Sequence, residues 1–222
     1  GAAIQEGTLT TSGTGVIRNI GTATLDGGST VLTNSGDIQQ NNGTITTLKN
    51  TINNTGSMSL NNTSIFNNTD LKVSGGNVDL TGGGSVVLGN VTANNRIVGA
   101  TSTDRLTNVN NTIEGAGQIG ANIMALTNQG TINANQTNTL TIDPSATGAI
   151  NTGTMQASSG GTLRLNTGTF TNTGGTIQAL NGSLVELHGA TIQEGTLTTA
   201  GTGIIRNIST ATLDGGSTVL TN

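Results

Sequence analysis

The beginning and the end of this chain carry almost the same sequence. Residues 1–34 and 189–222 differ at only four positions, so the string that opens the chain starts again at Gly189. Each difference exchanges side chains of similar size, as in Ser12 and Ala200. Near-identity at a fixed distance is the mark of a tandem repeat. We therefore expect residues 1–188 to be one repeat unit of a larger protein, and 189–222 to be the start of the next unit.

The composition restricts the kind of core that such a chain can form. It contains 35 glycines, no Cys, Trp or Tyr, and two aromatic residues, Phe66 and Phe170. Because aromatic side chains normally supply much of the area buried in a compact globular core, burial here must come from Ile, Leu and Val. These residues recur in short alternating runs, and only 8% of the chain is charged. Both features argue against a disordered chain.

A shorter repeat lies inside the long one. It is a phrase of the form Asn-x-Gly-Thr-(Ile/Met)-x-Ala, with one extra Gly in its third copy. The copies are Asn128–Ala134, Asn151–Ala157 and Asn172–Ala179. A period of about 20–22 residues, built from short strands between Gly and Asn turns, is typical of a β-solenoid. We predict an all-β fold, a single-stranded parallel β-helix of about 10 coils that runs continuously over residues 1–222.

Alternation of apolar and polar residues with period 2 marks the strands. Examples are Thr139–Ile142, Thr162–Leu165, Thr191–Gln193 and Asn77–Leu80, in which the aliphatic side chains share one side. Gly and Asn between the runs supply the positive φ angles that sharp corners need. The side chains that we expect to point inward are Ile132, Leu140, Ile142, Met155, Leu163, Leu165, Phe170, Ile177, Val185, Leu187, Ile192 and Leu197.

The alignment of neighbouring coils predicts one ion pair. Residues 161–165 match residues 183–187 one coil later, with the apolar side chains of both segments inside. In that register Arg164 lies beside Glu186 on the outer surface. Opposite charges on adjacent strands stabilise a sheet by about 0.2–1 kcal/mol. The alternative is that two solvated charges share a face without pairing.

The phrase followed by a Leu-x-Leu strand resembles the repeats of bacterial filamentous haemagglutinin and related large exoprotein adhesins. One example is Asn151–Ala157 followed by Leu163–Leu165. The resemblance covers residues 106–222 and the matching start of the chain, and it is weaker over 41–98. It implies a right-handed parallel β-helix, secreted by bacteria and displayed as a stalk or fibre. The motif residues are structural, so the resemblance transfers no functional residue.

Some parallel β-helices degrade or bind polysaccharides, as lyases and phage tailspikes do, and their sites use clustered carboxylates. The 11 acidic residues of this chain are scattered singly along the sequence. Asp26 and Asp214 occupy identical Leu-Asp-Gly-Gly-Ser turns, so we expect them to be copies of one turn and not partners in a site. His188 is the single histidine, so no His-pair metal site is available. We expect no catalytic, metal or cofactor site and no enzyme activity.

Threonine-rich strands raise a second alternative, an ice-binding solenoid. Thr8–Thr10 and Thr196–Thr198 fit a Thr-x-Thr pattern, but it does not recur at every coil, and threonine is a good β-former in any case. A net charge of −4 argues against nucleic acid as a partner. No apolar stretch approaches the roughly 20 residues that cross a bilayer, so we expect no membrane insertion by this segment.

These observations favour a structural repeat segment of a very large secreted bacterial surface protein. We expect it outside the cell or on the cell surface, as a fibre, stalk or matrix filament for adhesion. Its partners would be further copies of the same repeat, in tandem or end to end. Host or cell-surface glycans would be bound through other regions. Carbohydrate binding by the segment itself is the main rival function, but aromatic side chains for stacking against sugars are scarce.

Overall fold

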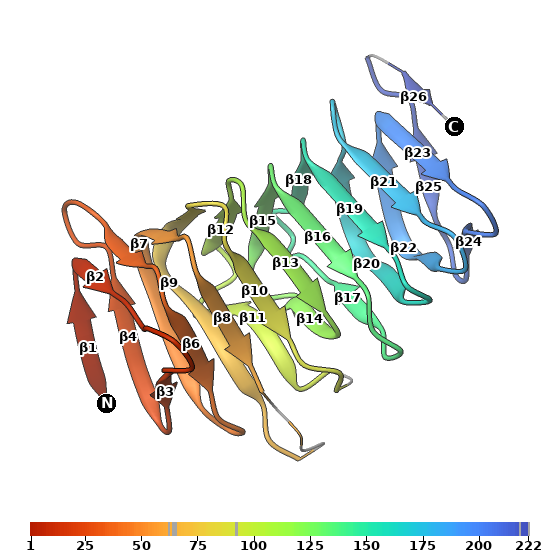
Figure 1. Ribbon diagram of the computed structural model, residues 1–222. Helices are drawn as coiled ribbons and strands as arrows, with labels where there is room; N and C mark the ends of the chain where they lie inside the picture. Colours follow the sequence, from red (N-terminus) through yellow and green to blue (C-terminus); the bar gives the residue numbers. More distant parts are fainter. Residues whose placement is uncertain (62, 64–65, 92, 218, 222) are drawn as a thin grey trace.

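The computed structural model describes residues 1–61, 63, 66–91, 93–217 and 219–221. Throughout these residues the regular structure is β-strand, with no helix. All pairings between the described strands are parallel, and the strands stack into an elongated β-solenoid of about 10 coils (Figure 1). The predictions of an all-β fold, of parallel pairing and of about 10 coils are confirmed.

Each coil contributes one strand segment to each of three faces. Among the described residues, faces 1 and 2 form a 16-stranded sheet, because four long strands bend around the corner between them, and face 3 is a separate 10-stranded sheet. Face 1 contains β1 (Ala2–Gln5), β4 (Thr22–Asp26), the first parts of β7 (Ile45–Asn54) and β9 (Thr69–Thr81), β11 (Asn95–Gly99), β14 (Gly117–Gly120), β17 (Leu140–Ile142), the first parts of β20 (Thr162–Thr171) and β22 (Leu184–Gln193), and β24 (Ile204–Asn207). Face 2 contains β2 (Gly7–Leu9), β5 (Leu32–Asn34), the second parts of β7 and β9, β12 (Arg105–Asn108), β15 (Ala125–Asn128), β18 (Ala149–Asn151), the second parts of β20 and β22, and β25 (Thr212–Asp214). Face 3 contains β3 (Ile17–Asn19), β6 (Asp37–Gln40), β8 (Ser57–Leu60), β10 (Ser85–Leu88), β13 (Thr112–Gly115), β16 (Thr131–Ala134), β19 (Thr154–Ala157), β21 (Thr176–Ala179), β23 (Gly195–Thr199) and β26 (Leu220–Thr221).

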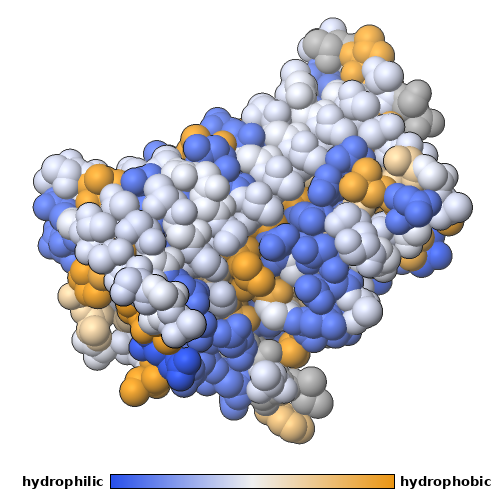
Figure 2. Space-filling model, in the orientation of Figure 1, coloured by the Kyte–Doolittle hydropathy of each residue, from blue (hydrophilic) through white to orange (hydrophobic). Residues whose placement is uncertain are grey.

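The core consists of aliphatic columns that run along the solenoid axis. On face 3, for example, Ile132 pairs with Met155, and Met155 pairs with Ile177. The structure buries all twelve side chains that the sequence analysis placed inside, with 4% or less of each exposed. A buried aliphatic side chain stabilises a fold by about 1.5–3 kcal/mol. Figure 2 shows hydrophilic and weakly polar residues over most of the viewed surface, with small apolar patches between them.

The coils are unequal in length, which the nearly uniform period predicted from the sequence did not include. Ile132 and Met155 are paired neighbours on face 3. Met58 and Val86 are also paired neighbours, although they lie further apart in the sequence. The pairing on face 3 continues unchanged through both coils, and part of the extra length of the longer coil lies at the bend of β9, where the register with β7 shifts between Leu48 and Asn50.

Candidate assembly site: the asparagine ladder and the coil edges

A row of buried asparagines runs along the corner between faces 2 and 3. These residues, the asparagine ladder, are fully buried, with an exposed fraction of 0%. They are Asn34, Asn54, Asn108, Asn111, Asn128, Asn151 and Asn172. Most end a face 2 strand or directly follow it, just before the chain turns onto face 3.

The ladder is joined by hydrogen bonds between side chains of successive coils. Nδ2 of Asn128 donates to Oδ1 of Asn151 at 2.8 Å, and Nδ2 of Asn151 donates to Oδ1 of Asn172 at 2.7 Å. Each carboxamide is both a donor and an acceptor, so the same side chain can repeat indefinitely along a stack. Asn151 Nδ2 also approaches the main-chain oxygens of Gly153 and Thr176, both at 3.3 Å.

One coil in the middle of the solenoid uses two asparagines to continue the ladder. Asn54 donates to Oδ1 of Asn111 at 2.9 Å, and Asn108 donates to Oδ1 of Asn128 at 2.9 Å. The two central residues are linked to each other, because the backbone N–H of Asn111 donates to Oδ1 of Asn108. Asn111 lies two coils after Asn54, and its own Nδ2 donates to the main-chain oxygens of Leu80 and Thr81 in the coil between them. The ladder therefore continues past a coil that contributes no ladder asparagine.

Close packing between coils requires one glycine in each phrase, namely Gly130, Gly153 and Gly175. A Cβ atom built on Gly153 would lie 2.2 Å from the carbonyl oxygen of Gly130 in the preceding coil. Only glycine permits such an approach between two backbones. The phrase asparagine was expected to be a turn residue, and the buried hydrogen bonds of its side chain were not predicted. The available signal was its constant place two residues before glycine.

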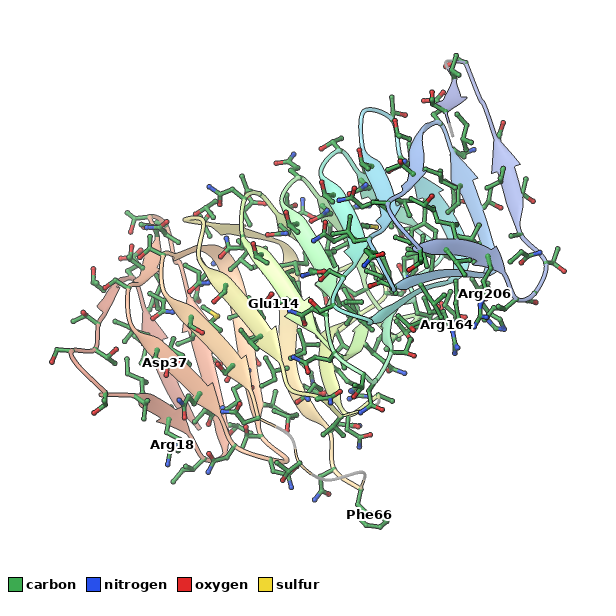
Figure 3. All side chains as sticks on the ribbon, turned by 45° about the vertical axis from the view of Figure 1, so that its right-hand side comes forward. Arg18, Asp37, Phe66, Glu114, Arg164 and Arg206 are labelled. Atoms are coloured by element: carbon green, nitrogen blue, oxygen red, sulfur yellow. The ribbon has the colours of Figure 1, made fainter. Side chains whose placement is uncertain are left out.

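The predicted partners Arg164 and Glu186 lie on paired strands, and a second arginine joins them. Nη2 of Arg164 lies 2.7 Å from one carboxylate oxygen of Glu186, and Nη2 of Arg206 lies 2.6 Å from the other. Figure 3 shows Arg164 and Arg206 toward the same end of the molecule, and their strands, β20 and β24, lie on either side of β22. The Glu186 side chain faces outward, yet it is only 6% exposed because the two guanidinium groups cover it. The contact with Arg206, which lies beside Glu186 in the following coil, was not predicted.

The arginines also determine the ionisation of Glu186. Burial alone raises the pKa of this carboxyl, but the hydrogen bonds from Arg206 and Arg164 outweigh burial and leave the pKa below its ordinary value. A similar contact between coils joins Arg96 and Asp70, whose closest atoms are 2.7 Å apart. Ion pairs therefore hold together neighbouring coils at two heights of face 1.

The remaining candidate residues have local roles. Asp26 and Asp214 each accept a hydrogen bond from the backbone N–H of the glycine two residues later, as expected of turn residues. His188 is exposed and contacts Oδ1 of Asn166. In the part of the chain that the structure describes, no three His, Cys, Asp or Glu side chains are grouped so as to hold a metal ion. That part also contains no helix long and apolar enough to span a membrane.

Both ends of the stack expose apolar side chains that continue the core columns. Ile4 of the first coil is 36% exposed, and Leu213 of the last coil is 56% exposed. At the last coil, Leu197, Ile205 and Leu220 line a groove that is open to solvent. The outermost strands also carry unpaired backbone groups, which are templates for a further strand. These edges are the candidate assembly surfaces.

No family model, curated protein or solved structure matches this chain significantly. The β-solenoid fold therefore rests on the structure itself. The likeness to filamentous haemagglutinin repeats rests on the sequence phrase alone.

Proposed function

We propose that this chain is a structural repeat segment of a large secreted bacterial surface protein. In this proposal it forms part of an extracellular fibre, stalk or matrix filament, of the kind found in filamentous haemagglutinin-like adhesins. It has no enzymatic role, and its partners are further repeat units in tandem. Attachment to glycans belongs to other regions of the larger protein.

The observation that supports this proposal is that the repeated coil pairs in the same register at both ends of the chain. Ile4 lies against Leu25 in the first copy, and the equivalent Ile192 lies against Leu213 in the second. A coil that keeps its pairing at both ends of a unit allows units to follow one another without any change of sequence. In repeat proteins the stability is then approximately a sum over neighbouring coils, so the length can increase freely.

Several contacts along the axis suit an element that must resist mechanical tension. Each coil is joined to the next by parallel β hydrogen bonds on three faces, and much of the stack is also joined by the asparagine ladder. With a rise of about 4.8 Å per coil, one unit extends the filament by roughly 40 Å. The proposed mechanism is mechanical, because a stiff rod holds a distal region away from the cell.

The proposal is tested by the dependence of length on the number of units. Chains of one, two and three units would be compared by small-angle scattering and electron microscopy. We expect a thin rod that lengthens by about 40 Å per unit and gives an axial reflection near 4.8 Å. Particles that grow in all directions, or whose length does not change with unit number, would contradict the proposal.

A further inference from the structure

The two copies of the repeated sequence lie on different faces of the solenoid. The segment Gly7–Leu9 forms β2 on face 2, whereas its equivalent at residues 195–197 lies in β23 on face 3. The segment Ile17–Asn19 forms β3 on face 3, whereas its equivalent at residues 205–207 lies in β24 on face 1. Every segment of the second copy is thus displaced by one face relative to the first.

Pairing and local geometry do not change with this displacement. Gly7 pairs with Leu32 in the first copy, and Gly195 pairs with Leu220 in the second. The turn that precedes these glycines is also preserved, because Glu6 and Glu194 both have positive φ, 57° and 61°. The same string therefore forms the same coil in both places, and only the face on which it begins differs.

The number of coils in one unit explains the displacement. Along face 1, eight successive pairings lead from β1 through the stack to β22. The equivalent of Ile4 is Ile192, which lies later in β22, in the part that pairs on face 2. The unit of residues 1–188 therefore spans eight coils and one additional face, or eight and one third coils.

We propose that successive repeat units stack with an advance of one face per unit, so that three units, about 25 coils, restore the starting face. The surface feature that one unit carries on face 1 then lies on face 2 in the next unit and on face 3 in the one after. Phe66, which is 86% exposed and projects from one side in Figure 3, would recur on all three sides of the filament. This inference rests on the proposed function in that it assumes units in tandem.

The two ends of the chain also give the contacts at the junction between units. Arg206 reaches back to Glu186 in the preceding coil, and its equivalent Arg18 reaches forward to Gln39 in the following coil at 3.3 Å. Figure 3 shows these two arginines at opposite ends of the molecule. In a tandem array one arginine makes both contacts. The next unit then adds a coil whose sequence corresponds to the residues after Asn34. This coil pairs with β24 in the register in which β6 pairs with β3.

The face advance can be measured inside the present chain, which has no cysteine of its own. Spin labels would be placed on Cys variants of Arg18 and Thr198, which are joined by an unbroken column of eight pairings along face 3. The second pair is Arg18 and its equivalent Arg206. Arg206 lies in β24, the strand that follows β23 in the chain, on face 1. Electron paramagnetic resonance distances are then compared. We expect about 38 Å for the same-face pair and a distance roughly 5–10 Å longer for the equivalent pair.

A second label set protects the test against a variant that fails to fold. Ile20 directly follows β3 and Ala200 directly follows β23, so both lie at the same end of face 3. The equivalent of Ile20 is Ile208, which directly follows β24 on face 1. All three residues are exposed, so labels there disturb no core contact. Circular dichroism verifies that each labelled chain is folded.

In both label sets, the same-face pair is expected to be closer than the equivalent pair. A shorter distance for the same-face pair in both sets supports the one-face advance. A shorter distance for the equivalent pair in either set means that the unit contains a whole number of coils, and overturns the proposal.

These distances need no filament, so the two proposals fail separately. If the rods do not lengthen with unit number but the label distances are as expected, the tandem filament and the face advance between units are both rejected. The unit of eight and one third coils is then still supported. Rods that lengthen, together with a shorter distance between equivalent residues, would support the filament and overturn the face advance.

Discussion

The two copies of the repeated string have nearly the same sequence and opposite surroundings. Ile4 is 36% exposed, whereas its equivalent Ile192 is fully buried beneath the coil that precedes it. The order reverses one coil later, because Leu25 is 4% exposed and its equivalent Leu213 is 56% exposed. In a solenoid, burial is decided by the neighbouring coil, while the string itself decides only its turns and its pairing. Substitutions at equivalent positions therefore isolate the contribution of the neighbour.

The largest difference is expected between the two equivalent isoleucines. Ile192→Ala should lower the free energy of unfolding by about 2–5 kcal/mol, because it removes buried methyl groups from a packed column. Ile4→Ala, on the exposed edge, should cost less than about 1 kcal/mol. Denaturant unfolding of both variants, followed by circular dichroism, measures the difference. Equal losses would mean that the string and not its neighbour sets the contribution.

The equivalent glycines separate backbone strain from close packing. Gly7 and Gly195 both have positive φ, at 78° and 71°, so alanine is strained at either position. At Gly195 a Cβ atom would also lie 1.9 Å from the carbonyl oxygen of Asn172, whereas nothing lies within 4 Å at Gly7. We expect Gly195→Ala to cost about 1–3 kcal/mol more than Gly7→Ala. A thermal unfolding series measures this, and equal costs would remove the packing argument for the glycine.

The asparagine ladder allows a comparison between an asparagine inside the ladder and the last ladder asparagine before the second copy. Asn151 is bonded to ladder residues on both sides, whereas Asn172 donates only long bonds, 3.4–3.5 Å, to backbone oxygens of the second copy. Asn151→Ala should cost about 1–3 kcal/mol, since it leaves buried amide groups unpaired, and Asn172→Ala should cost less. Hydrogen exchange at the flanking strands measures both. A larger loss at Asn172 would contradict the geometry.

A smaller difference is expected between the equivalent arginines. Arg206→Ala removes one of two guanidinium groups from Glu186 and should cost up to about 1 kcal/mol, since the arginine is half exposed. Arg18→Ala removes a single exposed hydrogen bond to Gln39 and should change the unfolding free energy very little. Chemical unfolding at low salt measures both variants. Raising the salt concentration should reduce the Arg206 effect and leave the Arg18 variant unchanged.

The smallest effect is the pH dependence that Glu186 contributes. Its folded pKa lies below the ordinary value of 4.5, so its stabilisation is complete above that pH and is lost as the pH falls through the folded pKa. Glu186→Gln should therefore be less stable than the parent at pH 7, and the gap should narrow toward pH 3. Comparison with the parent is needed because the pKa values of Glu6 and Asp26 are also lowered. If the difference in unfolding free energy between the parent and Glu186→Gln does not change with pH, the Glu186 carboxylate is not a source of the pH dependence.

Much of the fold could be predicted from local pattern. The apolar alternation within Thr162–Leu165 identified part of β20, and the match between adjacent coils gave the register in which Arg164 lies beside Glu186. Both succeeded because adjacent coils of similar length place similar residues in contact. The longer coil between Met58 and Val86 could not be predicted in this way, since part of its extra length forms the bend of β9, where the register with β7 shifts.

The sequence by itself determined the repeat, the strand alternation, the turns and the inward-pointing residues, because these depend on the order of apolar, polar and glycine residues along one coil. Only the tertiary structure decided that the phrase asparagines form a buried ladder, that Arg206 completes the cover of Glu186, and that the second copy begins one face later than the first. Each of these depends on the total length of several coils and on which residues that length brings together across the stack. No single stretch of sequence contains that information.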